Sequence, residues 1–233
     1  MHIYGLEKLS LVDYEGLCSA VVFTGGCNFL CPFCHNSGLV YRNVDILDEA
    51  EVLEYLRGRS KMLDAVVVSG GEPTLQADLK DFVAKLKAMG YKVKLDTNGT
   101  NYEVLKDLVE ERLVDYVAMD IKNSLAEYPR TVGTKCVNID NIRKSIAYLI
   151  EGHVEYEFRT TLVAQLHDTA SITDMAQDIK GAKVLYLQKF VDSDHNIKDG
   201  LTEVDETTAK QYQKILQGTV EMVKLRGYQE IDA

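Results

Sequence analysis

The chain has 233 residues and a formal net charge of −10, from 36 acidic and 26 basic residues. So acidic a chain has no overall attraction for phosphate backbones, and we expect no nucleic-acid partner. No apolar run approaches the roughly 20 residues that span a bilayer, and the amino terminus lacks the basic-then-apolar order of a signal peptide. These features predict a cytoplasmic protein without a membrane partner.

Short apolar runs alternate with amphipathic runs along the whole chain, which is the pattern of an α/β protein. Six such units with parallel strands predict an open, partial (β/α)6 barrel that forms one domain over residues 1–233. The predicted strands cover 20–24, 65–69, 92–96, 116–120, 156–163 and 184–190. The predicted helices cover 48–57, 75–89, 102–111, 139–151 and 172–180, with a long C-terminal helix at about 205–226.

A loop rich in cysteine follows the first predicted strand. Residues 25–36 read GGCNFLCPFCHN and place Cys27, Cys31 and Cys34 in a CxxxCxxC spacing. Thiolates are soft ligands that favour zinc, Cu(I) or iron–sulfur clusters, and three of them leave one iron of a 4Fe–4S cluster open. A closed zinc site needs a fourth ligand, for which His35 is the local candidate. Because His35 directly follows Cys34, the spacing favours the iron–sulfur cluster.

Polar side chains stand where the next predicted strands end. The second strand leads into Gly70-Gly71-Glu72, the third into Asp96-Thr97-Asn98, and the fourth into Asp120-Ile121-Lys122. In parallel barrels the active site lies at these carboxyl ends, so we expect the three segments to meet. Two neighbouring carboxylates need a cation or a shared proton. Each segment alone is also compatible with an ordinary loop, a turn or a surface ion pair.

The last two predicted strands add further candidates. Arg159 lies inside an apolar strand, where a guanidinium needs a negative partner such as Asp120 or a ligand carboxylate. Gln188 in the sixth strand and His195 after it are alternative ligand contacts. His153 and His167 are isolated in the sequence and receive no role. Cys18 and Cys136 lie outside the cluster spacing and are expected to be ordinary thiols.

Together these motifs resemble those of the radical S-adenosylmethionine (SAM) superfamily. The resemblance implies that Cys27, Cys31 and Cys34 hold a 4Fe–4S cluster whose open iron chelates the methionine end of SAM. Reductive cleavage of SAM then yields a 5′-deoxyadenosyl radical, which abstracts a hydrogen atom. The segment containing Gly70, Gly71 and Glu72 resembles the motif that holds the SAM amino group.

Segments along nearly the full length resemble the glycyl-radical activating enzymes, in particular anaerobic ribonucleoside-triphosphate reductase activating proteins. The resemblance implies a glycyl-radical enzyme as protein substrate and a flavodoxin or ferredoxin-type electron donor. It also implies the following roles: SAM contacts from Phe33, His35, Asn36, Asn98, Lys122 and Arg159, and a monovalent cation held by Asp96, Thr97 and Asp120.

The chain departs from the resembled pattern at two positions. Glu15 stands where the group usually has proline, and the sixth strand has Gln188 in a region where the pyruvate formate-lyase activating enzymes carry a histidine. Two alternatives come from other classes, and the loops disfavour the second of them. One is a radical SAM enzyme for a small biosynthetic molecule, and the other is a non-catalytic zinc or iron–sulfur module, which would need no Gly-Gly-Glu or Asp-Thr-Asn-Gly loop.

Overall fold

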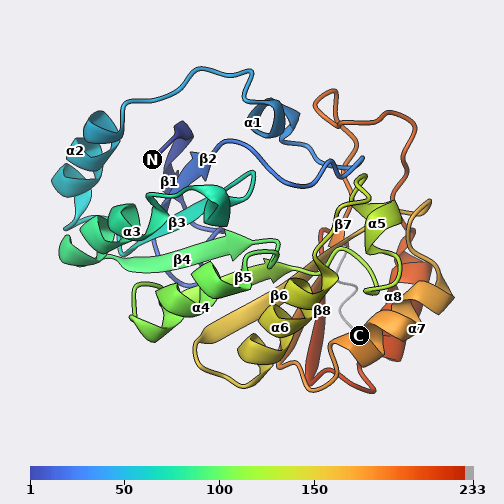
Figure 1. Ribbon diagram of the computed structural model, residues 1–233. Coiled ribbons are helices and arrows are strands. Elements are labelled where there is room, and N and C mark those ends of the chain that lie inside the picture. The colour runs from blue at the N-terminus through green and yellow to red at the C-terminus, as the bar shows by residue number, and fades with distance from the viewer. Residues whose placement is uncertain (229–233) are drawn as a thin grey trace.

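A computed structural model describes residues 1–228 of the chain. Its centre is one eight-stranded sheet in which the strands follow one another in chain order (Figure 1). The first strand runs antiparallel to the second, and every later pair is parallel. The strands are β1 (Ile3–Ser10), β2 (Ser19–Thr24), β3 (Ala65–Gly70), β4 (Lys92–Thr97), β5 (Tyr116–Asp120), β6 (Glu155–Leu162), β7 (Val184–Lys189) and β8 (Met222–Arg226).

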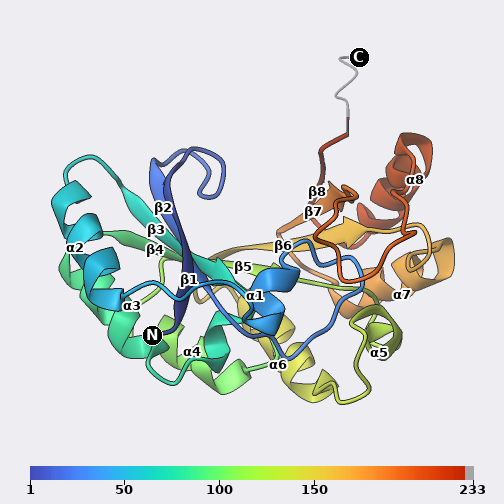
Figure 2. The same ribbon diagram turned by 90° about the horizontal axis from the view of Figure 1, so that it is seen from above.

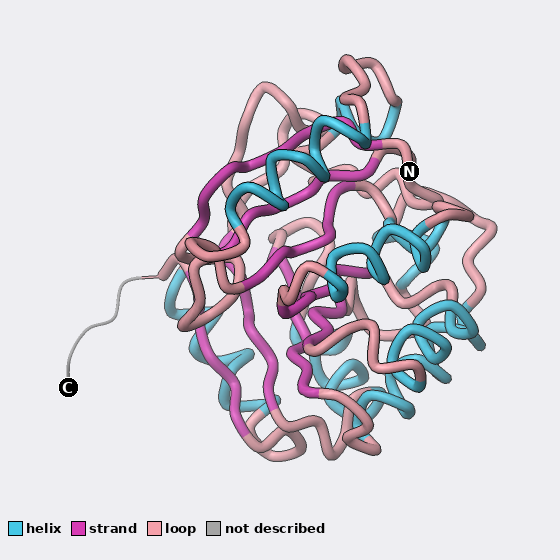
Figure 3. The backbone as a smooth tube through the Cα atoms, turned by 90° about the vertical axis from the view of Figure 1, so that its left-hand side faces the viewer, coloured by secondary structure: helices cyan, strands magenta, loops and turns pink. Residues whose placement is uncertain are grey.

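Helices cover the outer face of this curved sheet (Figures 2 and 3). Within residues 1–228 the edge strands β1 and β8 do not pair with each other, so the sheet stays open. The predicted partial barrel is therefore confirmed. The helices are α1 (Ser37–Tyr41), α2 (Glu49–Arg59), a 3₁₀ turn η1 (Pro73–Leu75), α3 (Leu79–Ala88), α4 (Tyr102–Glu110), α5 (Tyr128–Thr131), α6 (Ile139–Ile150), α7 (Thr169–Asp178) and α8 (Glu206–Leu216).

Apolar residues on both faces of the strands hold the sheet in place. In β3 every residue from Ala65 to Val68 is buried, as expected for a parallel strand covered on both sides. Outside the sheet, α3 buries Leu79, Phe82, Val83 and Leu86 at three- and four-residue steps. Each such side chain contributes about 1.5–3 kcal/mol on burial. A smaller cluster around Tyr14, Val21 and Val67 packs separately from the main core.

The predicted C-terminal helix is too long. Helix α8 ends at Leu216, and Met222–Arg226 instead forms β8, parallel to β7. Gly218 and the β-branched pair Thr219 and Val220 end the helical run, because such residues are poor helix formers. The following residues alternate in burial, with Val223 buried between two exposed neighbours, which is the period of a strand.

Strand β1 is the second strand that the sequence did not predict, and the short helices α1 and α5 were not predicted either. Strand β1 pairs with β2 along the edge of the sheet, and Gly5 lies against the ring of Phe23. Its bulged register and its half-exposed face explain why it lacks a clear apolar alternation. Across residues 1–228, no helix combines the length and the apolarity that crossing a membrane requires.

Candidate active site

The cysteine loop leaves β2 and crosses the carboxyl ends of the strands toward α5 (Figure 1). Backbone hydrogen bonds fix it at three points along its path. The Glu72 N–H donates to Gly26 O, the Leu30 N–H to Val132 O and the Lys198 N–H to Pro32 O, each at 2.9 Å. The loop is therefore held by segments that follow β3, α5 and β7, so that its three cysteines have a defined place at this end of the sheet.

Two glycines allow the cysteine loop to approach β3. A Cβ atom on Gly70 would lie 2.3 Å from Thr24 O, and one on Gly71 would lie 2.1 Å from Gly26 O. Gly70 also has a φ of +119°, which side-chain-bearing residues rarely adopt. The Gly-Gly pair is thus required for the close contact between the two loops, whatever ligand binds beside them.

Glu72 joins the loops that follow β3 and β4. Its side chain is fully buried, and its carboxylate accepts hydrogen bonds from Thr74 N (3.1 Å), Thr74 Oγ1 (2.6 Å), Thr97 Oγ1 (2.8 Å) and Asn98 N (2.6 Å). Burial raises the pKa of Glu72, and these four donors oppose that rise. These donors come from the segments after β3 and β4, so the Glu72 carboxylate braces the two loops against each other.

A charged group lies on the neighbouring strand ends, and Arg159 is at its centre. The Arg159 guanidinium donates from Nε to Asp120 Oδ1 at 2.9 Å and from Nη1 to Asp96 Oδ2 at 3.3 Å. Lys122 Nζ donates to Asp120 Oδ2 at 2.8 Å. The structure therefore brings together four candidates that the sequence placed on three different strands, and opposite charges alternate among them.

These contacts set the charge states of the group. Burial alone would raise the pKa of the Asp120 carboxyl, but Arg159 and Lys122 hold it at about 2. Burial would lower the pKa of Lys122, yet Asp120 and Cys31 reverse this effect and raise it. The pKa of Arg159 is raised for the same reason, because two carboxylates outweigh its burial. All three groups are accordingly charged at neutral pH.

One oxygen of this group lacks a hydrogen-bond donor. Asp96 Oδ1 is buried without a partner among the described residues, whereas Oδ2 accepts from Ser69 Oγ at 2.9 Å and from Arg159. A buried carboxylate oxygen without a donor costs about 1–3 kcal/mol. A cationic or N–H-bearing ligand at Asp96 would remove this cost.

The cysteine loop borders the charged group. Lys122 Nζ lies 5.9 Å from the centroid of the buried Phe33 ring. Burial lowers the pKa of His35, and the nearby charge of Lys122 adds to this lowering. Asn98 Nδ2 lies 4.0 Å from Cys27 Sγ and donates to Asn28 Oδ1 at 2.9 Å. Phe33, His35 and Asn98 therefore meet the other candidates as expected.

The remaining candidates lie at the margin of this arrangement. Asn36 precedes α1, and its carbonyl accepts from the Leu39 and Val40 N–H groups. The Thr97 hydroxyl points to Glu72 instead of to the two aspartates. Gln188 is half-buried on β7 beside Thr161 of β6, whereas His195 is exposed in the loop after β7.

One family model and several known proteins resemble this chain. Residues 21–179, more than half of the chain, match the family model described as the Radical SAM superfamily. The chain belongs to the radical SAM superfamily. It is 36% identical over 201 residues to the "Putative glycyl-radical enzyme activating enzyme" of Methanocaldococcus jannaschii, covering 82% of this chain and 81% of that protein. It therefore belongs with the activating enzymes of the superfamily.

Further relatives extend the comparison. The pyruvate formate-lyase-activating enzyme of Listeria monocytogenes is 30% identical over 146 residues, which are 57% of this chain and 58% of that protein. Among solved structures, Streptococcus suis SuiB bound to S-adenosylmethionine superposes with a TM-score of 0.70 at 14% identity. That match covers 89% of this chain and 50% of SuiB. At this identity the structural match demonstrates a shared fold.

Radical SAM enzymes use an iron–sulfur cluster and SAM, and the residues of this site suit both. Burial raises the pKa of Cys27 to about 12 and that of Cys31 to about 11, and a soft metal displaces such protons when it binds. No group of three or more His, Cys, Asp and Glu side chains within residues 1–228 is arranged to hold a single metal ion. Asp96 Oδ1, Lys122 and Arg159 offer complementary charges for an amino acid ligand.

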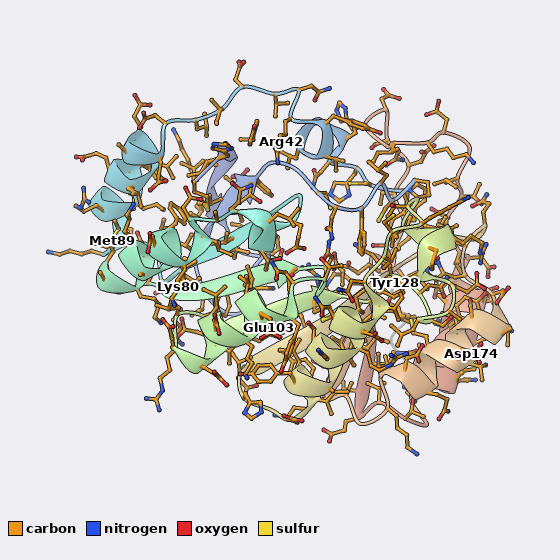
Figure 4. The ribbon with its side chains drawn as sticks, viewed as in Figure 1. Arg42, Lys80, Met89, Glu103, Tyr128 and Asp174 are labelled. Carbon is orange, nitrogen blue, oxygen red and sulfur yellow. The ribbon has the colours of Figure 1, made fainter. Side chains whose placement is uncertain are left out.

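The structure adds site residues that the sequence did not indicate. Ser69 donates to Asp96, and Tyr128, labelled in Figure 4, accepts from the Lys122 N–H at 3.1 Å. His167 lies 2.9 Å from the Lys122 carbonyl through Nε2. Ser69 could have been found because it directly precedes the Gly-Gly motif. Tyr128 lies in the short helix α5 and His167 in the loop after β6, so no local sequence pattern indicated their contacts with Lys122.

Proposed function

We propose that this chain cleaves SAM reductively at a 4Fe–4S cluster and abstracts a hydrogen atom from a glycine of a partner glycyl-radical enzyme. Cys27, Cys31 and Cys34 hold the cluster in this proposal. The observation that carries it is the position of the three-cysteine loop beside the charged group, where Asp96 Oδ1 lacks a donor and Lys122 and Arg159 supply positive charge. The similarity to the Methanocaldococcus jannaschii protein supports the activating role.

Within this site the chain's own residues bind and orient SAM. Lys122 and Arg159 attract its carboxylate, and Asp96 Oδ1 accepts from its ammonium group. Phe33 and the segment His35–Asn36 give an apolar and a polar surface next to the cysteines. When bound, the cluster and SAM supply an electron and a carbon radical that abstracts hydrogen. The braced loops keep the cysteines and the charged group in one arrangement, which is the protein's contribution to rate.

A monovalent cation is the alternative occupant of the position at Asp96 Oδ1, with Asp96, Thr97 and Asp120 as its oxygen donors. The partnerless Asp96 Oδ1 supports it. Arg159 competes with it, because the guanidinium already neutralises both carboxylates. Thr97 would bind through its carbonyl oxygen, since its hydroxyl donates to Glu72.

The proposed protein substrate is an anaerobic ribonucleoside-triphosphate reductase. Hydrogen abstraction from glycine is favoured because two flanking amides stabilise the α-radical, and no side chain blocks the approach. An open sheet leaves room for such a protein segment, which a closed barrel would exclude. The electron comes in this proposal from a flavodoxin or ferredoxin-type donor.

Electron paramagnetic resonance tests this function. Reduced, cluster-loaded protein is mixed anaerobically with SAM and the reductase from the same organism, and a glycine-centred doublet is expected. The reductase with that glycine replaced by alanine is the matched control, and it should give no doublet. If 5′-deoxyadenosine forms no faster with the reductase than without it, a small molecule would be the better substrate class.

A further inference from the structure

The backbone of Lys122 is held on both sides by groups outside the sheet. Strand β5 ends at Asp120, so the N–H and C=O groups of Lys122 have no partner in the strand ladder. The N–H donates to Tyr128 Oη at 3.1 Å, and the carbonyl oxygen lies 2.9 Å from His167 Nε2. The two backbone hydrogen bonds fix the position of the Lys122 main chain. They thereby set where its side chain starts, and that side chain contacts both Asp120 and Phe33.

The contacts of His167 define which ring nitrogen carries the proton. A carbonyl oxygen only accepts, so Nε2 must donate to Lys122 O. In a neutral ring Nδ1 is then an acceptor, and the Val163 N–H donates to it at 3.0 Å. Val163 O lies 3.2 Å from Nδ1 but forms no hydrogen bond with it in this tautomer, because both atoms are acceptors. The ring is 2% exposed, and burial lowers its pKa. The neutral Nε2–H tautomer therefore satisfies both nitrogens.

His167 is itself held from behind. Tyr212 Oη of α8 donates to the His167 carbonyl at 3.1 Å. Leu166 directly precedes His167, and its carbonyl accepts from Asn123 Nδ2 and from Arg130 Nη2, each at 2.9 Å. The loop after β6 is thus joined to α8 and to the segment after β5, and the imidazole is its link to Lys122.

We propose that His167 is a positioning residue that places the Lys122 ammonium at the SAM and cluster site. This inference rests on the proposed function only in giving Lys122 a SAM contact. In this proposal the hydrogen bond from Nε2 to the Lys122 carbonyl positions Lys122, whereas the hydrogen bond at Nδ1 only stabilises the loop that contains His167. A buried histidine with a purely structural role would need both bonds equally, and this difference makes the proposal testable.

Two amide substitutions separate the bonds. In His167→Asn the amide oxygen replaces Nδ1 and the contact with Lys122 is lost, whereas in His167→Gln the amide nitrogen replaces Nε2 and that contact is kept. SAM binding to the cluster-loaded protein is measured by calorimetry, without any protein substrate. We expect His167→Asn to raise the Kd for SAM about tenfold and His167→Gln to change it less than about twofold, by analogy with groups that orient metal ligands.

The reduction potential of the cluster gives a second measure. A cation near the cysteines stabilises the more negative, reduced cluster, so the potential should fall in His167→Asn and stay unchanged in His167→Gln. Tyr212→Phe is the control for stability, because it removes a bond behind His167 and leaves the ring in place. It should lower the free energy of unfolding without changing the Kd for SAM.

Equal loss of SAM binding in both amide variants, or no loss in His167→Asn, would overturn the proposal. Should these variants fail to fold, nitrogen-15 chemical shifts of the wild-type imidazole at pH 7 decide, because they require no substitution. The expected spectrum shows Nε2 protonated and Nδ1 unprotonated. An unprotonated Nε2 would contradict the bond to the Lys122 carbonyl, and with it the positioning role. Loss of glycyl-radical formation has no bearing on these measurements.

Discussion

Two groups of residues at the carboxyl ends of the strands differ in how their polar atoms are satisfied. In the first, which we call the Glu72 brace, one buried carboxylate receives all its hydrogen bonds from Thr74, Thr97 and Asn98. In the charged group, Asp96, Asp120, Lys122 and Arg159 pair with one another, yet Asp96 Oδ1 has no partner within the described residues. The brace is complete without a ligand, and the charged group is not.

The adjacent residues Asp96 and Thr97 belong to different groups. Successive side chains of a strand point to opposite faces, so β4 sends Asp96 toward Arg159 and Thr97 toward Glu72. Adjacent motif residues at the end of one strand therefore have different roles: Thr97 helps to hold the loops in place, and Asp96 faces the ligand site. Removing a brace residue should lower stability most, and removing a charged-group residue should lower SAM affinity most.

The largest expected effect is on Glu72. In Glu72→Ala the buried N–H groups of Thr74 and Asn98 lose their acceptor, and each such loss costs about 1–3 kcal/mol. We expect the free energy of unfolding to fall by about 3 kcal/mol or more, measured by urea denaturation. Glu72→Gln is the matched control, since it keeps the shape and one acceptor oxygen and should cost less. A change below about 1 kcal/mol in the alanine variant would show that the brace is not needed.

Asp96→Asn should reverse this pattern. It removes the charge that faces an ammonium group while keeping the shape, and a hydrogen bond to a charged group contributes about 1.5–3 kcal/mol. The Kd for SAM should therefore rise at least about tenfold. Iron content should stay the same, and the loss in the free energy of unfolding that comes from weakening the pair with Arg159 should be smaller than in Glu72→Ala. Calorimetry, iron analysis and urea denaturation of the same preparation give the three values. Unchanged SAM affinity would remove Asp96 from the ligand site.

The sequence was sufficient to predict the strands and the strand-end location of the site. The six predicted strands are present within one or two residues, because buried parallel strands have continuous apolar runs such as Ala65–Val68. The edge strands β1 and β8 were missed, since one-sided burial leaves a weaker pattern. The sequence also did not predict which motif residues brace the loops and which face a ligand. These roles depend on contacts between distant residues, such as that of Thr97 with Glu72, 25 residues apart.

The His167 contact illustrates the same limit. His167 and the Lys122 carbonyl are separated by 45 residues, and the histidine stands in a loop without a motif. By contrast, the Gly-Gly pair was predicted as a functional feature from its place after β3. The structure gives it a physical reason, because a Cβ on Gly71 would collide with the cysteine loop.

A smaller effect is expected from pH, through His167. Its pKa is lowered in the folded protein from 6.5, so the unfolded chain binds the proton first as the pH falls. Stability should therefore decrease below about pH 6.5. Burial is the main cause, with Arg130 adding to the lowering, whereas the Lys122 and Val163 backbone bonds and Asp168 act against it. Urea denaturation between pH 7 and pH 5 should show a steeper loss for the wild type than for His167→Gln, and equal slopes would contradict the buried neutral ring.

The smallest expected effect is that of Gln188→Ala on the Kd for SAM, which tests whether the ligand site extends from the charged group to β7. Gln188 pairs in register with Thr161, two residues beyond Arg159 and therefore on the same face of β6. His195 stands in the following loop and is exposed. A neutral hydrogen bond contributes about 0.5–1.5 kcal/mol, so Gln188→Ala should raise the Kd for SAM about two- to tenfold. His195→Ala, measured in the same calorimetric series, should leave it unchanged. A weaker affinity in the histidine variant alone would mean that the loop after β7 folds over the ligand, and the ligand site would then extend to that loop instead of ending at β7.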